Sequence, residues 1–150
     1  MAEQADGRRF GAYGMVLAPE GIVFIEKPGK GRGLEFPGGH GEPEDDSLEE
    51  CFERELNEET GVHVAPENMR LIDKPRVLPT HTSGIFLAQI ARLPKTLKKQ
   101  NEDEAGRVTE IVHVLTLKKV RSMRSRIFPP HLRYLDMALK MLDLSKFEKN

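Results

Sequence analysis

Short apolar runs separated by turn residues make up most of the first half of the chain. Residues 11–17 and 21–26 are two such runs on either side of the turn-like segment 18–21, and this arrangement predicts a β-hairpin. The same pattern predicts further strands at residues 34–36, 70–78, 83–91 and 108–115. The glycine-rich basic segment 27–33 and the charged segment 94–107 are predicted to be loops, the second of them mobile.

Three segments of the chain are predicted to be helices. A helix is predicted from Leu48 to Thr60, because Ser47 is a good N-cap residue, Glu50 completes a capping box and Gly61 can end the helix. A second helix is predicted over residues 131–143, where four leucines share one face, and a short one from Leu117 to about Arg124. Strands before, between and after helices predict an α/β fold with a mixed central sheet and helices on its faces.

Composition narrows the class of protein. The chain has 150 residues, of which 38% are hydrophobic and 31% charged, so it is expected to be a single soluble domain spanning 1–150. Its net charge of −1 gives no overall attraction to nucleic acid or to a membrane surface. A single cysteine, Cys51, and no apolar leader or membrane-spanning run predict a cytoplasmic protein. The polar residues 1–8 are expected to be flexible.

An acidic cluster is the most informative chemical feature. Glu55, Glu58 and Glu59 fall on one side of the predicted helix, the side that also carries the apolar residues Leu48, Cys51 and Phe52. Like charges at these spacings destabilise a helix, and directing them inward adds a desolvation cost. A hard divalent cation such as Mg²⁺ would offset both, because it is held by carboxylates and phosphate oxygens. The pattern therefore predicts a magnesium site.

This segment resembles the Nudix box. Arg54, Glu55, Leu56, Glu58, Glu59, Gly61 and Val62 match its second half without a gap, and residues 36–40 (FPGGH) resemble the usual approach to it. The first half departs from the pattern, because one extra residue lies between Gly39 and Arg54 and an aspartate takes the place of the first glutamate. We predict that Asp46 pairs with Arg54 as a structural contact. The resemblance also implies an α/β/α sandwich, the Nudix fold.

The resemblance implies hydrolysis of a nucleoside diphosphate linked to another moiety. The partner would be a small nucleotide such as an NDP-sugar, ADP-ribose, a dinucleoside polyphosphate or a nucleoside triphosphate. Glu55, Glu58 and Glu59, with the carbonyl of Gly39, would hold Mg²⁺, for which Mn²⁺ is an alternative. The same three glutamates would be catalytic, with Glu58 as the first choice of general base.

Several residues outside the box are further predictions for substrate contact or an added metal ligand. They are Lys27, Arg32, His40, Glu104 and Glu110. Glu104 and Glu110, together with Glu102, are the candidates for an added acidic metal ligand. Phe128 and Tyr134 could stack on a base, although packing is the simpler interpretation of both.

Other functions fit the sequence less well. The main alternative is a Nudix-fold module that binds a nucleotide without hydrolysing it. An isoprenoid diphosphate isomerase lacks a suitable cysteine outside the box, and an RNA-end processor lacks a clear basic stripe. Nucleic acid and membrane are not expected as partners, and a homodimer is compatible with the resemblance.

Overall fold

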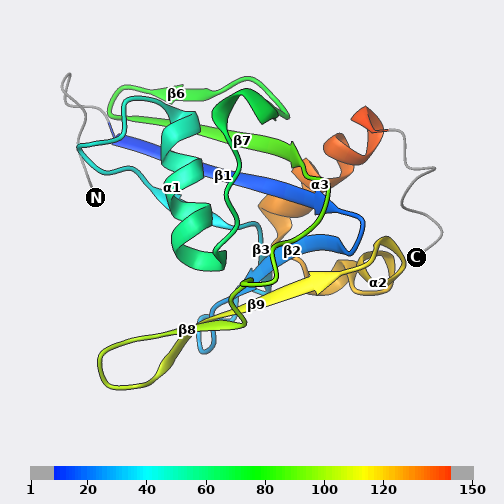
Figure 1. Ribbon diagram of the computed structural model, residues 1–150. Helices are drawn as coiled ribbons and strands as arrows, with labels where there is room; N and C mark the ends of the chain where they lie inside the picture. Colours follow the sequence, from blue (N-terminus) through cyan, green and yellow to red (C-terminus); the bar gives the residue numbers. More distant parts are fainter. Residues whose placement is uncertain (1–8, 143–150) are drawn as a thin grey trace.

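The computed structural model describes residues 9–142, so the flexibility expected of residues 1–8 lies outside the described part. The described chain forms three layers, with one mixed sheet between helix α1 on one face and helices α2 and α3 on the other (Figure 1). The predicted α/β/α architecture is confirmed.

The sheet is built around the long strand β1 (Arg9–Ala18). Strand β2 (Gly21–Glu26) follows it in the predicted hairpin, with Leu17 opposite Ile22. Strand β7 (His81–Gln89) lies on the other side of β1 and is parallel to it, whereas the other pairings are antiparallel. Strand β9 (Val108–Leu115) pairs with β2. With β5 (Met69–Leu71) and β8 (Gln100–Glu102) at the edges, the main strand order is β5-β7-β1-β2-β9-β8.

Short strands complete the sheet. Strand β3 (Leu34–Glu35) pairs with β2, and β4 (Gly38–His40) pairs with the first half of β1. The single strand predicted at residues 70–78 is two strands along β7, β5 (Met69–Leu71) and β6 (Arg76–Leu78). The break includes Pro75, which has no N–H to donate to a neighbouring strand.

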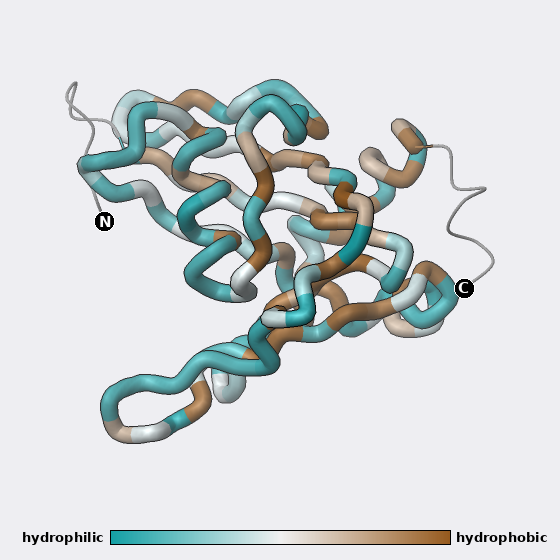
Figure 2. Tube along the Cα trace, viewed as in Figure 1, coloured by the Kyte–Doolittle hydropathy of each residue, from teal (hydrophilic) through white to brown (hydrophobic). Residues whose placement is uncertain are grey.

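The predicted loop 94–107 is not wholly a loop. Strand β8 (Gln100–Glu102) lies within it and pairs with β9 to form a hairpin that extends away from the rest of the molecule (Figure 1). The β8 side of this hairpin is largely hydrophilic, whereas hydrophobic residues concentrate in the central strands (Figure 2). Strand β8 therefore depends on backbone pairing, and the polar sequence gave no apolar alternation by which to predict it.

The helices agree closely with their predictions. Helix α1 (Leu48–Thr60) begins after Ser47, whose hydroxyl accepts a hydrogen bond from Glu50 N, and ends at Gly61 in the left-handed conformation. Helix α2 (Leu117–Ser122) is short, and α3 (Pro129–Met141) begins two residues before the prediction, with its prolines in the first turn where no N–H is needed. Single 3₁₀ turns occur at Pro66–Asn68 and Arg124–Arg126.

Two apolar clusters hold the layers together. One packs Cys51, Phe52 and Leu56 of α1 against the sheet residues Ala12 and Val16. The other packs α2 and α3 against the opposite face, where Met15, Phe24 and Phe36 are all fully buried. Both faces of β1 and β2 are thus covered, which explains why these strands read as almost continuous apolar runs. Within residues 9–142, no helix has the length and apolar character needed to cross a bilayer.

Candidate functional site

The site forms where β4 brings two glycines against α1. Gly38 has φ +149° and its N–H donates to Glu59 Oε1 at 2.7 Å. At Gly39, a Cβ atom would lie 2.7 Å from the carboxyl carbon of Glu55. Gly38 therefore brings a backbone N–H to Glu59, and the absence of a side chain at Gly39 leaves room for the carboxyl group of Glu55.

Glu59 is a buried acid beside a second acid. Glu59 is only 6% exposed, and its carboxyl group hydrogen-bonds to the carboxyl group of Glu110 on β9. Burial, followed by the hydrogen bond and the like charge of Glu110, raises the pKa of Glu59. Asn101 Nδ2 donates to Glu110 Oε1 at 3.1 Å and to the carbonyl of Glu59 at 2.8 Å, which holds β9 and α1 together at this point.

Glu55 and Glu58 differ in their surroundings. The Glu55 side chain is 17% exposed, and its pKa is raised mainly by burial, although Arg54 opposes that shift. The Glu58 side chain is 55% exposed. The expectation that all three acids share the buried side of the helix is therefore wrong for Glu58, which turns toward Arg54 at the surface.

Arg54 connects the acids to the preceding loop. Its Nη1 donates to Glu55 Oε1 at 3.1 Å and to Glu58 Oε1 at 3.2 Å, and its Nη2 donates to the carbonyl of His40 at 3.0 Å. Burial acts to lower the pKa of Arg54, but the hydrogen bonds and negative charges around it, Asp45 foremost, raise it. Arg54 therefore stays cationic and orients two acids of the cluster.

The predicted partner of Arg54 is corrected by one position. Arg54 Nε and Nη2 donate to Asp45, with distances of 3.0–3.2 Å, whereas Asp46 is exposed. A tight turn accounts for the difference, since Glu42 N donates to Asp45 Oδ2 and Asp45 N donates to the Glu42 carbonyl. The turn points Asp45 inward and leaves Asp46, whose N–H donates to Glu50, at the start of the helix.

The structure places the remaining predicted residues at different distances from the acids. Of the three candidate acids outside the box, Glu110 lies beside Glu59, whereas Glu102 and Glu104 are exposed on the β8–β9 hairpin. His40 follows the two glycines and is exposed; partial burial and the neighbouring His81 lower its pKa. Lys27 is half-buried just after β2.

Glu35 is a residue that the sequence analysis missed. It is 1% exposed, and within residues 9–142 neither of its carboxylate oxygens has a hydrogen-bond partner. Arg32 Nη2 lies 2.8 Å from Glu35 Oε1, but this ion pair lacks hydrogen-bond alignment. The Arg32 guanidinium also lies over the ring of Phe128, 4.7 Å from its centroid. Arg32 of the basic loop 27–33 thus makes defined contacts with Glu35 and Phe128. The sequence did not indicate a buried acid at Glu35, because the residues around it are apolar.

The donor set fits a hard divalent cation, although the side chains are not gathered around one point. In the described part of the chain, no group of three or more acidic, histidine or cysteine side chains has metal-holding geometry. The Glu55 carboxylate nevertheless lies against Gly39, and the buried carboxyl group of Glu59 lies beside the N–H of Gly38 and the partly buried Glu110. Such a pair is the environment that a divalent cation relieves.

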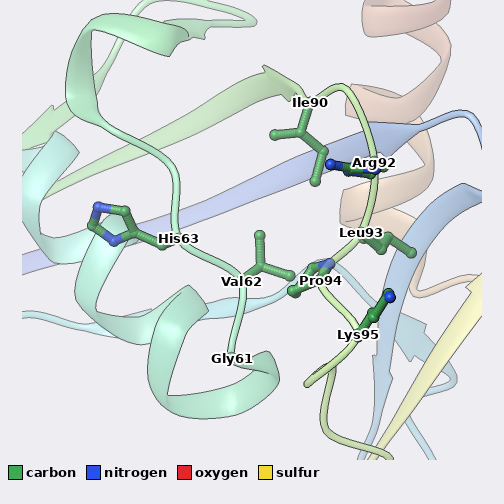
Figure 3. Close-up of a pocket in the computed structure, with 8 residues that line it drawn as sticks. All are labelled: Gly61, Val62, His63, Ile90, Arg92, Leu93, Pro94 and Lys95. Carbon is green, nitrogen blue, oxygen red and sulfur yellow. The ribbon is translucent and has the colours of Figure 1, made fainter.

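A cavity of about 520 Å³ lies beyond the C-terminal end of α1 (Figure 3). Val62, Ile90 and Leu93 contribute apolar surface to it, and Arg92 and Lys95 contribute charge. None of the acids described above lines this cavity, so it is separate from the acidic site.

Comparison with known proteins agrees with this geometry. The family profile described as the NUDIX domain matches residues 7–135. No curated protein matches the chain in sequence. Among solved structures, a NUDIX-family hydrolase from Clostridium perfringens has a TM-score of 0.62 at 16% identity, covering 91% of this chain and 99% of that one. The MutT structure from Aliivibrio salmonicida and Vibrio cholerae has a TM-score of 0.58 at 21% identity, covering 83% and 90%.

A third similar structure is the bifunctional NMN adenylyltransferase/ADP ribose pyrophosphatase from Francisella tularensis. It has a TM-score of 0.60 at 17% identity over 89% of this chain, which spans only 41% of the length of that protein. These similarities establish the fold. With the family profile matching most of its length, the chain belongs to the NUDIX domain family.

Proposed function

We propose that the chain hydrolyses the diphosphate bridge of a nucleoside diphosphate derivative and that it needs Mg²⁺ to do so, with Mn²⁺ as a substitute. The observation that carries this proposal is the pairing of the buried Glu59 with the partly buried Glu110, next to Glu55 and the glycines of β4. Two neighbouring carboxylates repel each other and destabilise the fold, and such pairs are typical of functional sites that bind a cation.

Glu55, Glu59 and Glu110 would hold the ion, with the Gly39 carbonyl and Glu58 as further oxygen ligands. When bound, the ion would supply positive charge for the diphosphate oxygens and lower the pKa of the attacking water. The structure of the Francisella protein in complex with AMP and a manganese ion supports an ion of this type.

The protein groups around the ion have separate tasks. The N–H of Gly38 fixes one oxygen of Glu59, and Arg54 orients Glu55. Glu58 is exposed and, among the residues that the structure describes, its carboxylate is held only by Arg54, so it can turn toward substrate and take a proton from water. We therefore keep Glu58 as the general base. Water attacks one phosphorus, and a nucleoside monophosphate and a phosphorylated remainder are released.

A substrate panel tests the proposal. NDP-sugars, ADP-ribose, dinucleoside polyphosphates and nucleoside triphosphates would be incubated with Mg²⁺ or Mn²⁺, and monophosphate release measured. We expect Glu59→Gln to lower turnover by at least about a hundredfold, as is common for groups that stabilise developing charge. The matched control is Glu53→Gln on the same helix, whose carboxylate contacts His63 instead of the acidic site. Full activity in Glu59→Gln would refute the assignment.

The non-hydrolytic alternative has two observations in its favour. Arg54 already pairs with Glu55 and Glu58, and the loop before α1 carries an extra residue. If the chain bound nucleotides but released no monophosphate with any metal, it would be a binding module.

A further inference from the structure

We propose that Glu35 and Phe128 form a recognition site for a guanine base, and that the side chain of Arg32 fills this site when no nucleotide is bound. The inference rests on the proposed function and specifies its substrate class as guanine nucleotides. Three contacts carry it: the exposed Arg32 guanidinium, the aromatic ring on which it lies, and the buried carboxylate beside it.

The carboxylate of Glu35 has unused capacity to accept hydrogen bonds. Its side chain is 2% exposed, yet neither oxygen receives an aligned hydrogen bond from any described residue. Buried polar groups without partners are rare in folded proteins and are costly to keep. The ion pair with Arg32 balances the charge of Glu35 but leaves the lone pairs of both oxygens free for a ligand.

Arg32 lies as a planar base would lie. Its guanidinium is flat, covers the Phe128 ring at 4.7 Å from the centroid, and brings one N–H group to Glu35. A guanine base has the same chemical features. Its faces stack on aromatic rings, and its N1–C2–N2 edge is itself a guanidine unit with adjacent N–H donors.

The choice of guanine follows from the acceptor-only character of a carboxylate. Two adjacent oxygens require two adjacent donors, and guanine supplies them as N1–H and the 2-amino group. Adenine and cytosine place an acceptor beside their amino group, and uracil places acceptors on both sides of its single N–H. Each of these bases would bring an acceptor against the Glu35 carboxylate, which is unfavourable.

Glu35 is close enough to the acidic site to read the base of the same nucleotide. It precedes Gly39 by four residues, so their Cα atoms are at most about 14 Å apart. Tyr13 lies opposite Gly38 in the β1–β4 pair. After burial, the charge of Glu35 and then those of Glu59 and Glu55 raise the pKa of Tyr13, so Tyr13 is near both Glu35 and the acidic site.

Arg32 can leave at little cost. Its side chain is 43% exposed, and it lies between Gly31 and Gly33, both of which have positive φ. A Cβ atom at Gly29 or Gly31 would contact nothing within 4 Å, so this part of the loop is open to solvent and has room to rearrange. Displacement by a base would thus exchange one stacked planar group for another.

Binding of nucleoside monophosphates without metal tests the site apart from catalysis. Calorimetric titration with GMP, IMP, AMP, CMP and UMP is expected to show GMP binding at least about tenfold more tightly than AMP, CMP and UMP. IMP keeps the N1–H group but lacks the 2-amino group, so it should fall between GMP and AMP. This ligand series requires no variant and holds even if a substitution disturbs folding.

Three variants sharpen the test. Glu35→Gln should bring GMP down to the affinity of AMP, because an amide offers one acceptor and a donor, while Phe128→Leu should weaken GMP and AMP alike. Arg32→Ala should strengthen GMP binding severalfold, because the competing side chain is gone. If Arg32→Ala instead weakened all five ligands equally, Arg32 would be a phosphate contact and the inference would be wrong.

Hydrolysis separates this inference from the proposed function. With Mg²⁺, kcat/KM would be compared for GTP and ATP and for GDP- and ADP-linked sugars. Turnover with no preference for guanine, or a preference unchanged in Glu35→Gln, would overturn the guanine site while the hydrolase remained. Selective GMP binding without any turnover would uphold the site and refute the hydrolase.

Discussion

At the scale of single residues, burial shifts the pKa values of ionisable groups away from their ordinary values. Glu59 is the clearest example among the acids, and His131 on α3 is its basic counterpart. His131 is buried, and its Nδ1 accepts a hydrogen bond from the backbone N–H of Phe36 at 2.9 Å. Burial, followed by the charges of Arg32 and Lys27, lowers its pKa from 6.5 to about 4.

We predict that His131 makes the fold sensitive to acid. Because the pKa of His131 is lower in the folded protein, its stabilising effect is complete above pH 6.5 and is lost as the pH falls toward about 4. His131→Asn can keep an acceptor for Phe36 N but cannot be protonated. Thermal unfolding between pH 7 and pH 4 should therefore show a gap between wild type and variant that shifts in favour of the variant on acidification. A constant gap would contradict the prediction.

The roles of particular residues show what the sequence could reveal. The helix that carries the acids was predictable, because its N-cap, C-cap and apolar residues are all local signals. The partner of Arg54 was not, since the choice between Asp45 and Asp46 depends on a turn within the inserted loop. Glu35 was not predicted as a site residue, because it lies among apolar residues and its ion pair with Arg32 depends on a side-chain conformation.

At the scale of elements, the loop before α1 and strand β4 hold the site in place. The loop supplies Asp45, which is 4% exposed and bonds Arg54 from one side. Its neighbour Asp46 is exposed and makes no hydrogen bond to Arg54 in the described structure. Substitution of each aspartate in turn therefore tests which of the two holds Arg54.

We predict that Asp45→Asn destabilises the protein by about 1–3 kcal/mol, because it weakens hydrogen bonds to a charged group. Asp46→Asn should change stability by less than about 0.5 kcal/mol, as is usual for surface positions. Urea unfolding of both variants checks this. Equal effects would show that the two aspartates share the arginine in solution.

The two glycines of β4 should fail in different ways when replaced. A Cβ at Gly38 would lie 2.2 Å from the carbonyl oxygen of Ala12, and its φ of +149° strains any other residue. The three atoms nearest to a Cβ at Gly39 all belong to the flexible carboxyl end of Glu55, and the closest lies at 2.7 Å. Gly38→Ala should therefore lower the melting temperature, whereas Gly39→Ala should fold normally and lose most of its turnover. Melting curves and kcat measurements on both variants decide the matter.

At the scale of the whole molecule, the acidic site joins segments from distant parts of the chain. Strand β4, helix α1 and strand β9 each supply a group, and Asn101 at the base of the β8–β9 hairpin connects the last two. The main strands and the helices on the sheet faces were predictable from patterning, whereas the order of the strands was not predicted and β8 was not recognised, because its residues are polar.

We predict that divalent cations stabilise the whole fold. The raised pKa of Glu59 means that metal-free stability falls as the pH rises above 4.5, the ordinary value for glutamate. At a hundredfold excess of Mg²⁺ over its dissociation constant, the melting temperature at pH 8 should rise by about 5–10 °C. Glu59→Gln should melt higher than wild type without metal, since it removes a carboxyl group that ionises on unfolding at this pH, and should gain little from Mg²⁺. A magnesium-induced rise of equal size in both proteins would contradict the prediction.

The different neighbours of Gly38 and Gly39 have a consequence for how sequence variants of this chain are interpreted. Loss of the first glycine would be detected by cellular quality control, because the damaged protein would be degraded and its abundance would fall. Loss of the second would leave a protein of normal abundance that still folds and occupies its place in the cell without working. A screen that scores protein levels alone would pass an inactive Gly39→Ala variant, and only an assay of the chemistry would detect it.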